Sequence, residues 1–166
     1  MEMETFSLVS AGEWVALVVC ALVCFTAAAL GALTTKPQIE TWYVRLRKPS
    51  WTPPAWVFGP VWSSLYPAMA VAVWLVWRRA GWQDGRLELT LFALQLVLNS
   101  AWSFIFFRFH SLGWAFVEIV ALWMAIGTTI VTFVGVSQLS ALLLIPYFAW
   151  VCFAAALNLA IWRMNE

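Results

Sequence analysis

The stretch WYVRLRKPSWTPPAWVFGPVW, residues 42–62, lies between two long apolar runs and brings tryptophans, prolines and cations together. Its Lys48-Pro49 and Thr52-Pro53-Pro54 steps are incompatible with a regular helix, because proline has no N–H to donate and restricts the residue before it. We therefore expect a semi-rigid segment that holds one shape at little entropic cost. Two interpretations fit its tryptophans: an aromatic belt at the level of the lipid headgroups, or a lid over a cavity for a flat apolar ligand.

The composition on both sides of this stretch is that of an integral membrane protein. Of the 166 residues, 64% are hydrophobic and 10% are charged, whereas soluble domains carry about 25% charged residues. The formal net charge of +1 provides no basic field, so we expect no nucleic-acid partner. The first apolar run leads into no soluble domain, which indicates a retained membrane span rather than a signal peptide.

Five apolar segments are each long enough to cross a bilayer core of about 30 Å, which takes about 20 helical residues. None shows the two-residue alternation of a membrane barrel strand, so we expect an all-α integral membrane protein. Its single domain, residues 1–166, is predicted to be a bundle of five transmembrane helices in which the last two are antiparallel neighbours, because their connection is so short. The expected helices are residues 14–33, 57–77, 87–107, 112–134 and 139–162.

Lysine and arginine at the ends of the helices predict the orientation in the membrane. With the N-terminus outside, three cations lie on the outer side, namely Arg78, Arg79 and Arg86. We therefore expect the N-terminus out, the C-terminus in and residues 42–62 on the cytoplasmic side. The inner side then carries the other cations: Lys36, Arg45, Arg47, Lys48, Arg108 and Arg163.

Polar side chains within the spans are expected to face the bundle interior or a cavity, because they are costly in hydrocarbon. Mixed with large aromatics, they suit a flat apolar ligand that has a few polar edges. The alternative is that Asn and Gln only join neighbouring helices, at about 0.6–2 kcal/mol each. Four spans carry such stripes: Phe58, Trp62 and Tyr66; Gln95, Asn99 and Trp102; Trp114, Glu118 and Ala121; and Tyr147, Trp150, Ala154 and Leu157, with Asn158 beside them.

The sequence lacks the residues that most enzymatic chemistry requires. His110 is the only histidine, so two histidines of this chain cannot hold a haem iron. We find no nucleophile–base pair, phosphate loop or metal cluster, and we expect no metal site and no required cofactor. The cysteines Cys20, Cys24 and Cys152 lie in apolar runs and are expected to be buried small residues.

From the pattern WYxxLxKPxWxPPxxxFGPVW onward, the chain resembles the translocator protein / tryptophan-rich sensory protein family, also called the peripheral benzodiazepine receptor family. The resemblance continues through QLVLNSAWS at 95–103, PYFAW at 146–150 and Leu157-Asn158. It implies a five-helix bundle, commonly dimeric, whose cavity is closed by the loop between the first two helices, which favours the lid interpretation. Positions that match the family's cavity lining are Ala32, Tyr43, Phe58, Gly59, Trp62, Gln95, Asn99, Trp102, Trp114, Val117, Trp150, Ala154 and Leu157.

The resemblance also implies ligands. Family members bind porphyrins such as protoporphyrin IX, synthetic benzodiazepine-type and isoquinoline carboxamide compounds and, in animals, sterols. Leu159 stands where the animal sterol motif has a tyrosine, which argues against sterol binding, although that motif is weak even when complete. This departure fits a member from a bacterial cell membrane better than an animal member, which would lie in the mitochondrial outer membrane.

Three functions follow as hypotheses. The leading one is a membrane receptor or carrier of porphyrin-like tetrapyrroles, protoporphyrin IX or haem-like, whose propionates meet Arg45, Arg47 or Lys48 at the mouth of the cavity. In this interpretation Tyr43 and Trp62 contact the ligand, and two further tryptophans, Trp51 and Trp56, hold the stretch to the bundle.

The second hypothesis is light-dependent breakdown of the bound porphyrin, an activity that the resemblance implies, with Trp62 or Trp150 as redox partner. The third is a regulatory or sensory protein that acts as a homodimer. Ala27-xxx-Gly31 and Ala28-xxx-Ala32 offer small-residue faces for such contact on the first helix, although such pairs are common by chance.

Overall fold

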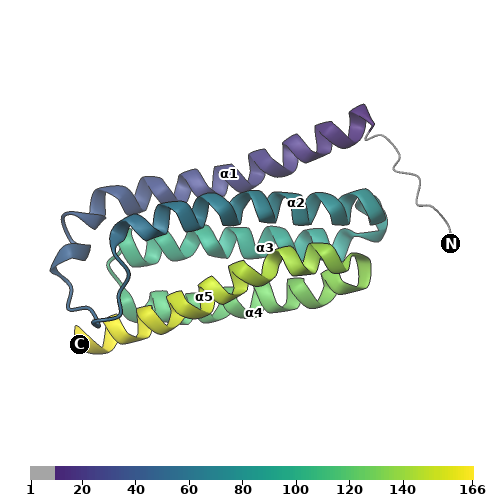
Figure 1. The fold of residues 1–166 in the computed structure, drawn as a ribbon. Helices are drawn as coiled ribbons and strands as arrows, with labels where there is room; N and C mark the ends of the chain where they lie inside the picture. Colours follow the sequence, from purple (N-terminus) through teal and green to yellow (C-terminus); the bar gives the residue numbers. More distant parts are fainter. Residues whose placement is uncertain (1–9) are drawn as a thin grey trace.

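The structure, a computed structural model, describes residues 10–166 and consists of five long helices (Figure 1). Each helix is long and apolar enough to cross a membrane, and no strand occurs between residues 10 and 166. The predicted all-helical membrane bundle is therefore confirmed. The helices are α1 (Ala11–Ile39), α2 (Phe58–Asp84), α3 (Arg86–Ser103), α4 (Leu112–Val136) and α5 (Gln138–Met164), and a π-helical turn, η3 (Phe104–Arg108), continues α3.

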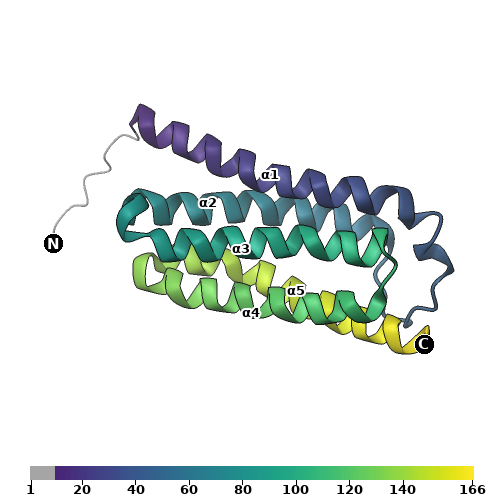
Figure 2. The ribbon, with the colours of Figure 1, turned by 180° about the vertical axis from the view of Figure 1, so that it is seen from behind.

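Contacts between the helices arrange them as a ring in the order α1, α2, α5, α4, α3 (Figures 1 and 2). The most extensive contact joins α4 and α5, which only Ser137 separates. The Ser137 hydroxyl accepts a hydrogen bond from the Ser140 N–H at 3.3 Å and caps α5, as Ser does at many helix starts. The antiparallel pairing of the last two helices is thus as predicted.

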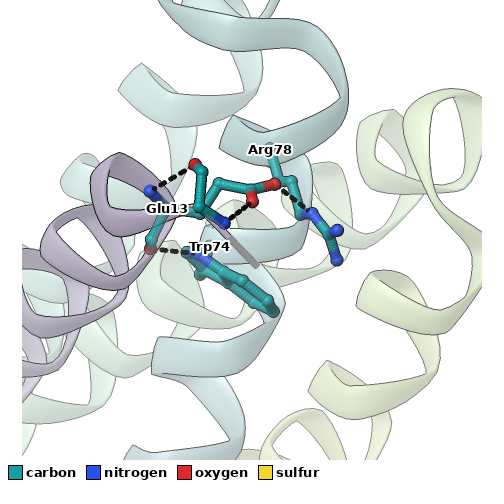
Figure 3. A network of polar contacts seen from close by, with 4 residues as sticks. Glu13, Trp74 and Arg78 are labelled. Carbon is teal, nitrogen blue, oxygen red and sulfur yellow. Dashed lines mark hydrogen bonds and ion pairs between the residues drawn. The ribbon is translucent and has the colours of Figure 1, made fainter. Parts of the chain in front are cut away.

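The N-terminal end of α1 is fastened to α2 (Figure 3). Ser10 and Glu13 form a reciprocal capping box, and the Glu13 carboxylate pairs with Arg78. The Trp74 indole donates to the Glu13 carbonyl oxygen at 2.9 Å, and the Arg78 guanidinium lies over the Trp74 ring. These contacts hold the start of a helix whose only buried residues are Cys24 and Ala27.

Two helices extend beyond their predicted C-terminal ends, and each runs through a residue that usually disrupts a helix. α1 continues through Pro37 to Ile39, because a proline removes one helical hydrogen bond without forbidding the next turn. α2 breaks at Gly81, where φ is 67°, and then continues to Asp84. Glycine adopts this left-handed conformation without a Cβ clash, so α2 bends at Gly81 and does not end there.

Small residues of α1 pack inside the chain. Ala27 is buried, and a Cβ on Gly31 would lie 3.3 Å from the Ser103 hydroxyl of α3. The Ala27-xxx-Gly31 face is therefore used within one chain, and the prediction of a homodimer has to rest on other surfaces. Cys20 and Cys24 are half-buried and buried, but the expectation of burial is wrong for Cys152, whose exposed sulfur accepts from the Trp123 indole.

Candidate ligand site

The connection between α1 and α2, residues 40–57, crosses the end of the bundle where α3 and α5 also end (Figure 1). Its helical structure is limited to two single turns, η1 (Tyr43–Arg45) and η2 (Ala55–Val57), as its prolines predict. The Trp42 ring lies 5.5 and 6.4 Å from the rings of Phe106 and Phe107, at the end of α3. Tyr43 lies at similar distances from the same two rings.

The other edge of the connection is held by α5. The Arg47 N–H donates to the Asn165 side-chain oxygen at 3.0 Å, and the Asn165 amide donates back to the Arg47 carbonyl at 2.9 Å. Trp51 packs edge-on against Phe153 at 5.8 Å and is 48% exposed, and Trp56 is 73% exposed. Together these contacts close residues 42–51 over the bundle end.

Lys48 has an internal role. Its ammonium donates to the carbonyl oxygens of Tyr43, Val44 and Leu46 at 2.7, 3.3 and 3.1 Å, and it lies 4.7 Å from the centre of the Tyr43 ring. Burial lowers the pKa of Lys48 and raises the pKa of the Tyr43 phenol. Lys48 therefore closes a turn of the connection, while the side chains of Arg45 and Arg47 are exposed.

Beneath the connection, one asparagine joins three helices. The Tyr66 hydroxyl donates to the Asn99 side-chain oxygen at 2.7 Å, and the Asn99 amide donates to the Tyr147 hydroxyl at 3.0 Å. All three residues are buried, and the Trp62 ring lies 5.3 Å from the Tyr66 ring and 6.2 Å from the Tyr147 ring. Asn99 thus performs the joining role that the alternative interpretation assigns to polar residues.

A second asparagine does the same nearer the connection. The Trp102 indole donates to the Asn158 side-chain oxygen at 3.1 Å, and the Asn158 amide donates to the Leu112 carbonyl at 3.0 Å. Trp102 also stacks on Phe106 at 5.0 Å. The bonds fix the end of α3 against α5 and the start of α4.

Three polar side chains of the described interior have no such partners: Gln95, Glu118 and Ser140. Gln95 is 1% exposed, and neither its amide nitrogen nor its oxygen has a hydrogen-bond partner among residues 10–166. The same holds for both carboxylate oxygens of Glu118. Leaving a buried polar atom unpaired costs about 1–3 kcal/mol. Gln95 of α3 and Glu118 of α4 therefore keep free hydrogen-bonding capacity inside the bundle.

The structure brings most of the predicted lining residues into two adjoining clusters. Around Phe106 and Phe107 lie Tyr43, Phe58, Trp102 and Leu157. The cluster around Tyr66 and Tyr147 includes Trp62, Trp102, Trp150 and Ala154. Phe58 and Trp150 connect the two clusters, with ring centroids 5.6 Å apart.

Four predicted residues are not brought to this centre. Trp114 and Val117 are 70% and 56% exposed, because the inward face of α4 is the row Ala115, Ile119, Leu122 and Ile126. Gly59 is exposed at the start of α2, and Ala32 is half-buried on α1.

The space beneath Trp42 and Tyr43 is filled by the buried rings of Phe106 and Phe107. Two surface hollows occur elsewhere: one of about 450 Å³ between α1 and η3, and one of about 270 Å³ between α4 and α5. The structure therefore shows the bundle end closed, with its aromatic and polar groups packed against one another.

Sequence reasoning did not identify Trp42, Phe107 or Asn165 as parts of this site. Trp42 stacks on His110 at 4.2 Å in addition to its contacts with α3. Two signals were available: the aromatic density of residues 42–62 for Trp42 and the FIFF run of η3 for Phe107. No local signal pairs Asn165 with Arg47, because 118 residues separate them.

The fold and this centre define a five-span membrane protein in which a Trp- and Pro-rich connection covers a buried aromatic and polar interior. Residues 19–163 match the TspO/MBR family, and the chain belongs to that family.

Relatives come from animals, archaea and bacteria. The chain is 45% identical to the human translocator protein over 127 residues, 75% of each chain. It is 41% identical to the tryptophan-rich protein TspO of Archaeoglobus fulgidus over 135 residues, 81% of this chain and 87% of that one. The match to the protein CrtK of Rhodobacter capsulatus is 38% over 143 residues, 86% and 88% of the two chains. These identities do not favour one group, so bacterial origin stays a prediction.

Proposed function

We propose that this chain is a membrane receptor or carrier that binds porphyrin-like tetrapyrroles, such as protoporphyrin IX, inside the bundle beneath residues 42–51. The observation that carries the proposal is Gln95, a fully buried amide with no partner among the described residues, one helical turn from the Asn99 network. Trp62, Trp102 and Trp150 provide flat apolar surfaces around that network. A planar hydrophobic ligand with a few polar edges matches both features.

Binding requires the connection to open, because side chains fill the space beneath it. The two turns η1 and η2 contain no buried residue of their own, and opening uncovers the rings of Phe106 and Phe107 beneath Trp42 and Tyr43. The contacts that must break are the ring contacts of Trp42, Tyr43 and Trp51 and the paired hydrogen bonds between Arg47 and Asn165. Segments with few buried contacts open at low free energy, and the prolines keep the connection stiff as it moves.

Charge supports the choice of an anionic guest. The exposed side chains of Arg45 and Arg47 flank the closed edge of the connection and form no ion pair within the described part of the chain. Guanidinium groups bind carboxylates through paired hydrogen bonds, so they are the expected partners of porphyrin propionates. We infer that this cation-rich end of the bundle is cytoplasmic, with the N-terminus outside.

The test is a fluorescence titration of the purified chain in detergent with protoporphyrin IX. We expect saturable quenching of tryptophan emission with one porphyrin per chain. Replacing the exposed Trp82, at the end of α2 away from the connection, with Phe should leave the Kd unchanged. Quenching that rises linearly with porphyrin, or equally in detergent that contains an unrelated membrane protein, contradicts the proposal.

A second candidate function is light-driven breakdown of the bound porphyrin in the presence of oxygen. The contact of Trp62 with Tyr66 and Tyr147 favours it, because a tryptophan beside two tyrosines can be re-reduced after it donates an electron. Under illumination, Trp150→Phe and Trp62→Phe should retain binding and slow product formation. Equal rates in both variants, or with free porphyrin in detergent, contradict this function.

A further inference from the structure

A hollow of about 450 Å³ opens on the lipid-facing side of the bundle, between the last turns of α1 and the π-helical turn η3. Leu30, Leu33 and Phe104 line one part of it, and Gln38 and Arg108 line the other. Leu30, Leu33 and Arg108 are exposed, so the hollow faces away from the Asn99 network.

The apolar part lies deeper in the membrane than the polar part. α1 and α3 run in the same direction (Figures 1 and 2), and the approach of Gly31 to Ser103 sets their levels. At the bundle end, Gln38 hydrogen-bonds the His110 ring at 3.1 Å, just beyond Arg108. From Leu30 to Gln38 a helix rises about 12 Å at 1.5 Å per residue, which spans the step from acyl chains to headgroups.

The polar part offers a cation beside hydrogen-bond acceptors. Arg108 has no carboxylate within 4.0 Å, since Glu13–Arg78 is the single ion pair of residues 10–166. The helix α1 and the π-helical turn η3 end at this level, and helix C-termini carry partial negative charge. Pro37, which also lines the hollow, has no N–H for the carbonyl of Leu33, so that oxygen lacks its regular helical donor.

We propose that this hollow binds one molecule of phosphatidylethanolamine. The lipid phosphate accepts hydrogen bonds from Arg108, and an acyl chain lies along Leu30 and Phe104. The ammonium donates to the Leu33 carbonyl oxygen, because the carbonyls of Pro37 and Gln38 already accept from Thr41 and Trp42. The exposed Lys36 and Glu40 at the end of α1 offset each other, which leaves the charge of Arg108 to the lipid phosphate.

The headgroup chemistry separates this lipid from others. A primary ammonium has three N–H donors, whereas choline has none and is recognised instead by aromatic cages. A phosphatidylglycerol headgroup has a phosphate for Arg108 but no cation for the helix ends. The carbonyl acceptor on α1 therefore favours an ethanolamine headgroup, and Arg108 requires a phosphate.

The test uses the full chain in detergent, with added phosphatidylethanolamine, phosphatidylcholine and phosphatidylglycerol of identical acyl chains. Native mass spectrometry measures the lipids bound per chain. We expect one tightly bound phosphatidylethanolamine and at least about fivefold weaker binding of the other two lipids. Arg108→Gln should weaken the ethanolamine lipid about tenfold, the scale of a lost charge-assisted hydrogen bond, and Arg108→Lys should restore part of it. Arg86→Gln, an exposed cation at the other end of the bundle, is the matched control.

Three results would overturn the proposal. The first is equal retention of all three lipids, and the second is equal binding by the Arg108→Gln and Arg86→Gln variants. The third is a mass that changes from two chains to one on Arg108→Gln with no lipid involved, which would assign the hollow to a contact between copies. Circular dichroism of each variant confirms folding, and Leu33→Trp, which fills the hollow and keeps every charge, should also displace the lipid.

Discussion

Replacing Gln95 with Leu should raise the stability of the protein and weaken its ligand binding at the same time. The amide of Gln95 is 1% exposed and has two polar atoms without partners among the described residues. Leucine has a similar volume and needs no hydrogen bond. Each unpaired buried polar atom costs about 1–3 kcal/mol, and membrane measurements fall at the low end of such ranges. We therefore expect the free energy of unfolding to rise by about 1–2 kcal/mol.

The loss in binding follows from the same amide. If it meets one or two polar atoms of the porphyrin edge, its removal costs about 0.5–1.5 kcal/mol for each hydrogen bond. The Kd for protoporphyrin IX should then rise about 3- to 10-fold or more, because 1.4 kcal/mol corresponds to a tenfold change. Unfolding is followed by circular dichroism in detergent during titration with sodium dodecyl sulfate, and binding by tryptophan fluorescence.

Asn99→Leu is the matched control. It removes two formed hydrogen bonds and leaves the buried hydroxyls of Tyr66 and Tyr147 without their partner, so it should lower the stability by about 1–3 kcal/mol. If Gln95→Leu destabilises the fold as Asn99→Leu does, then Gln95 is already paired inside the bundle. If Gln95→Leu binds porphyrin as tightly as the wild type, the amide does not face the ligand. Either result refutes the reasoning.

Three further predictions concern the connection and the helix contacts. Asn165→Ala removes the two hydrogen bonds to the connection, which should lower the stability of the closed form by about 1–2 kcal/mol and speed porphyrin association several-fold. Stopped-flow fluorescence measures the association rate, and an unchanged rate would contradict the role of Asn165 in closing the connection. Burial raises the pKa of Tyr43 in the closed form, so Tyr43 ionises first in the open form. The closed form is therefore at full stability below the usual tyrosine pKa of about 10 and loses stability as the pH rises further. We expect residues 42–57 to be proteolysed faster above that pH in the wild type and not in Tyr43→Phe. Gly31→Val should destabilise the bundle by about 1–3 kcal/mol through overpacking against Ser103. Gly135→Val is the control, because a Cβ there meets nothing within 4 Å, and it should change the melting temperature little. Equal melting temperatures of the two variants would contradict the contact between Gly31 and Ser103.

The membrane bundle could be predicted because its signals are local. Twenty apolar residues are sufficient for a span, and the Ser137 connection leaves the last two helices no arrangement but antiparallel contact. The steps at Pro49 and Pro53 likewise exclude a regular helix in the connection. Asn99 and Gln95 could be placed in the interior because an amide in hydrocarbon is costly.

Which side of α4 points into the bundle could not be predicted in the same way. In a membrane both faces of a helix are apolar, so hydrophobicity does not distinguish the lipid side from the bundle side. The structure turns Ala115 and Ile119 inward and leaves Trp114 and Val117 outside. The role of Lys48 was also hidden, because its three carbonyl partners depend on the folded path of the connection.

The central claim is that porphyrin enters beneath residues 42–51, and a reversible lock on that segment tests it most directly. Arg47→Cys and Asn165→Cys, combined with replacement of Cys20, Cys24 and Cys152 by Ala, place two thiols where the connection meets α5. Mass spectrometry first verifies that oxidation has formed the disulfide. We predict that protoporphyrin IX binds at least tenfold more slowly to the oxidised form and that reduction restores the rate. Equal association rates in the two forms would contradict the claim.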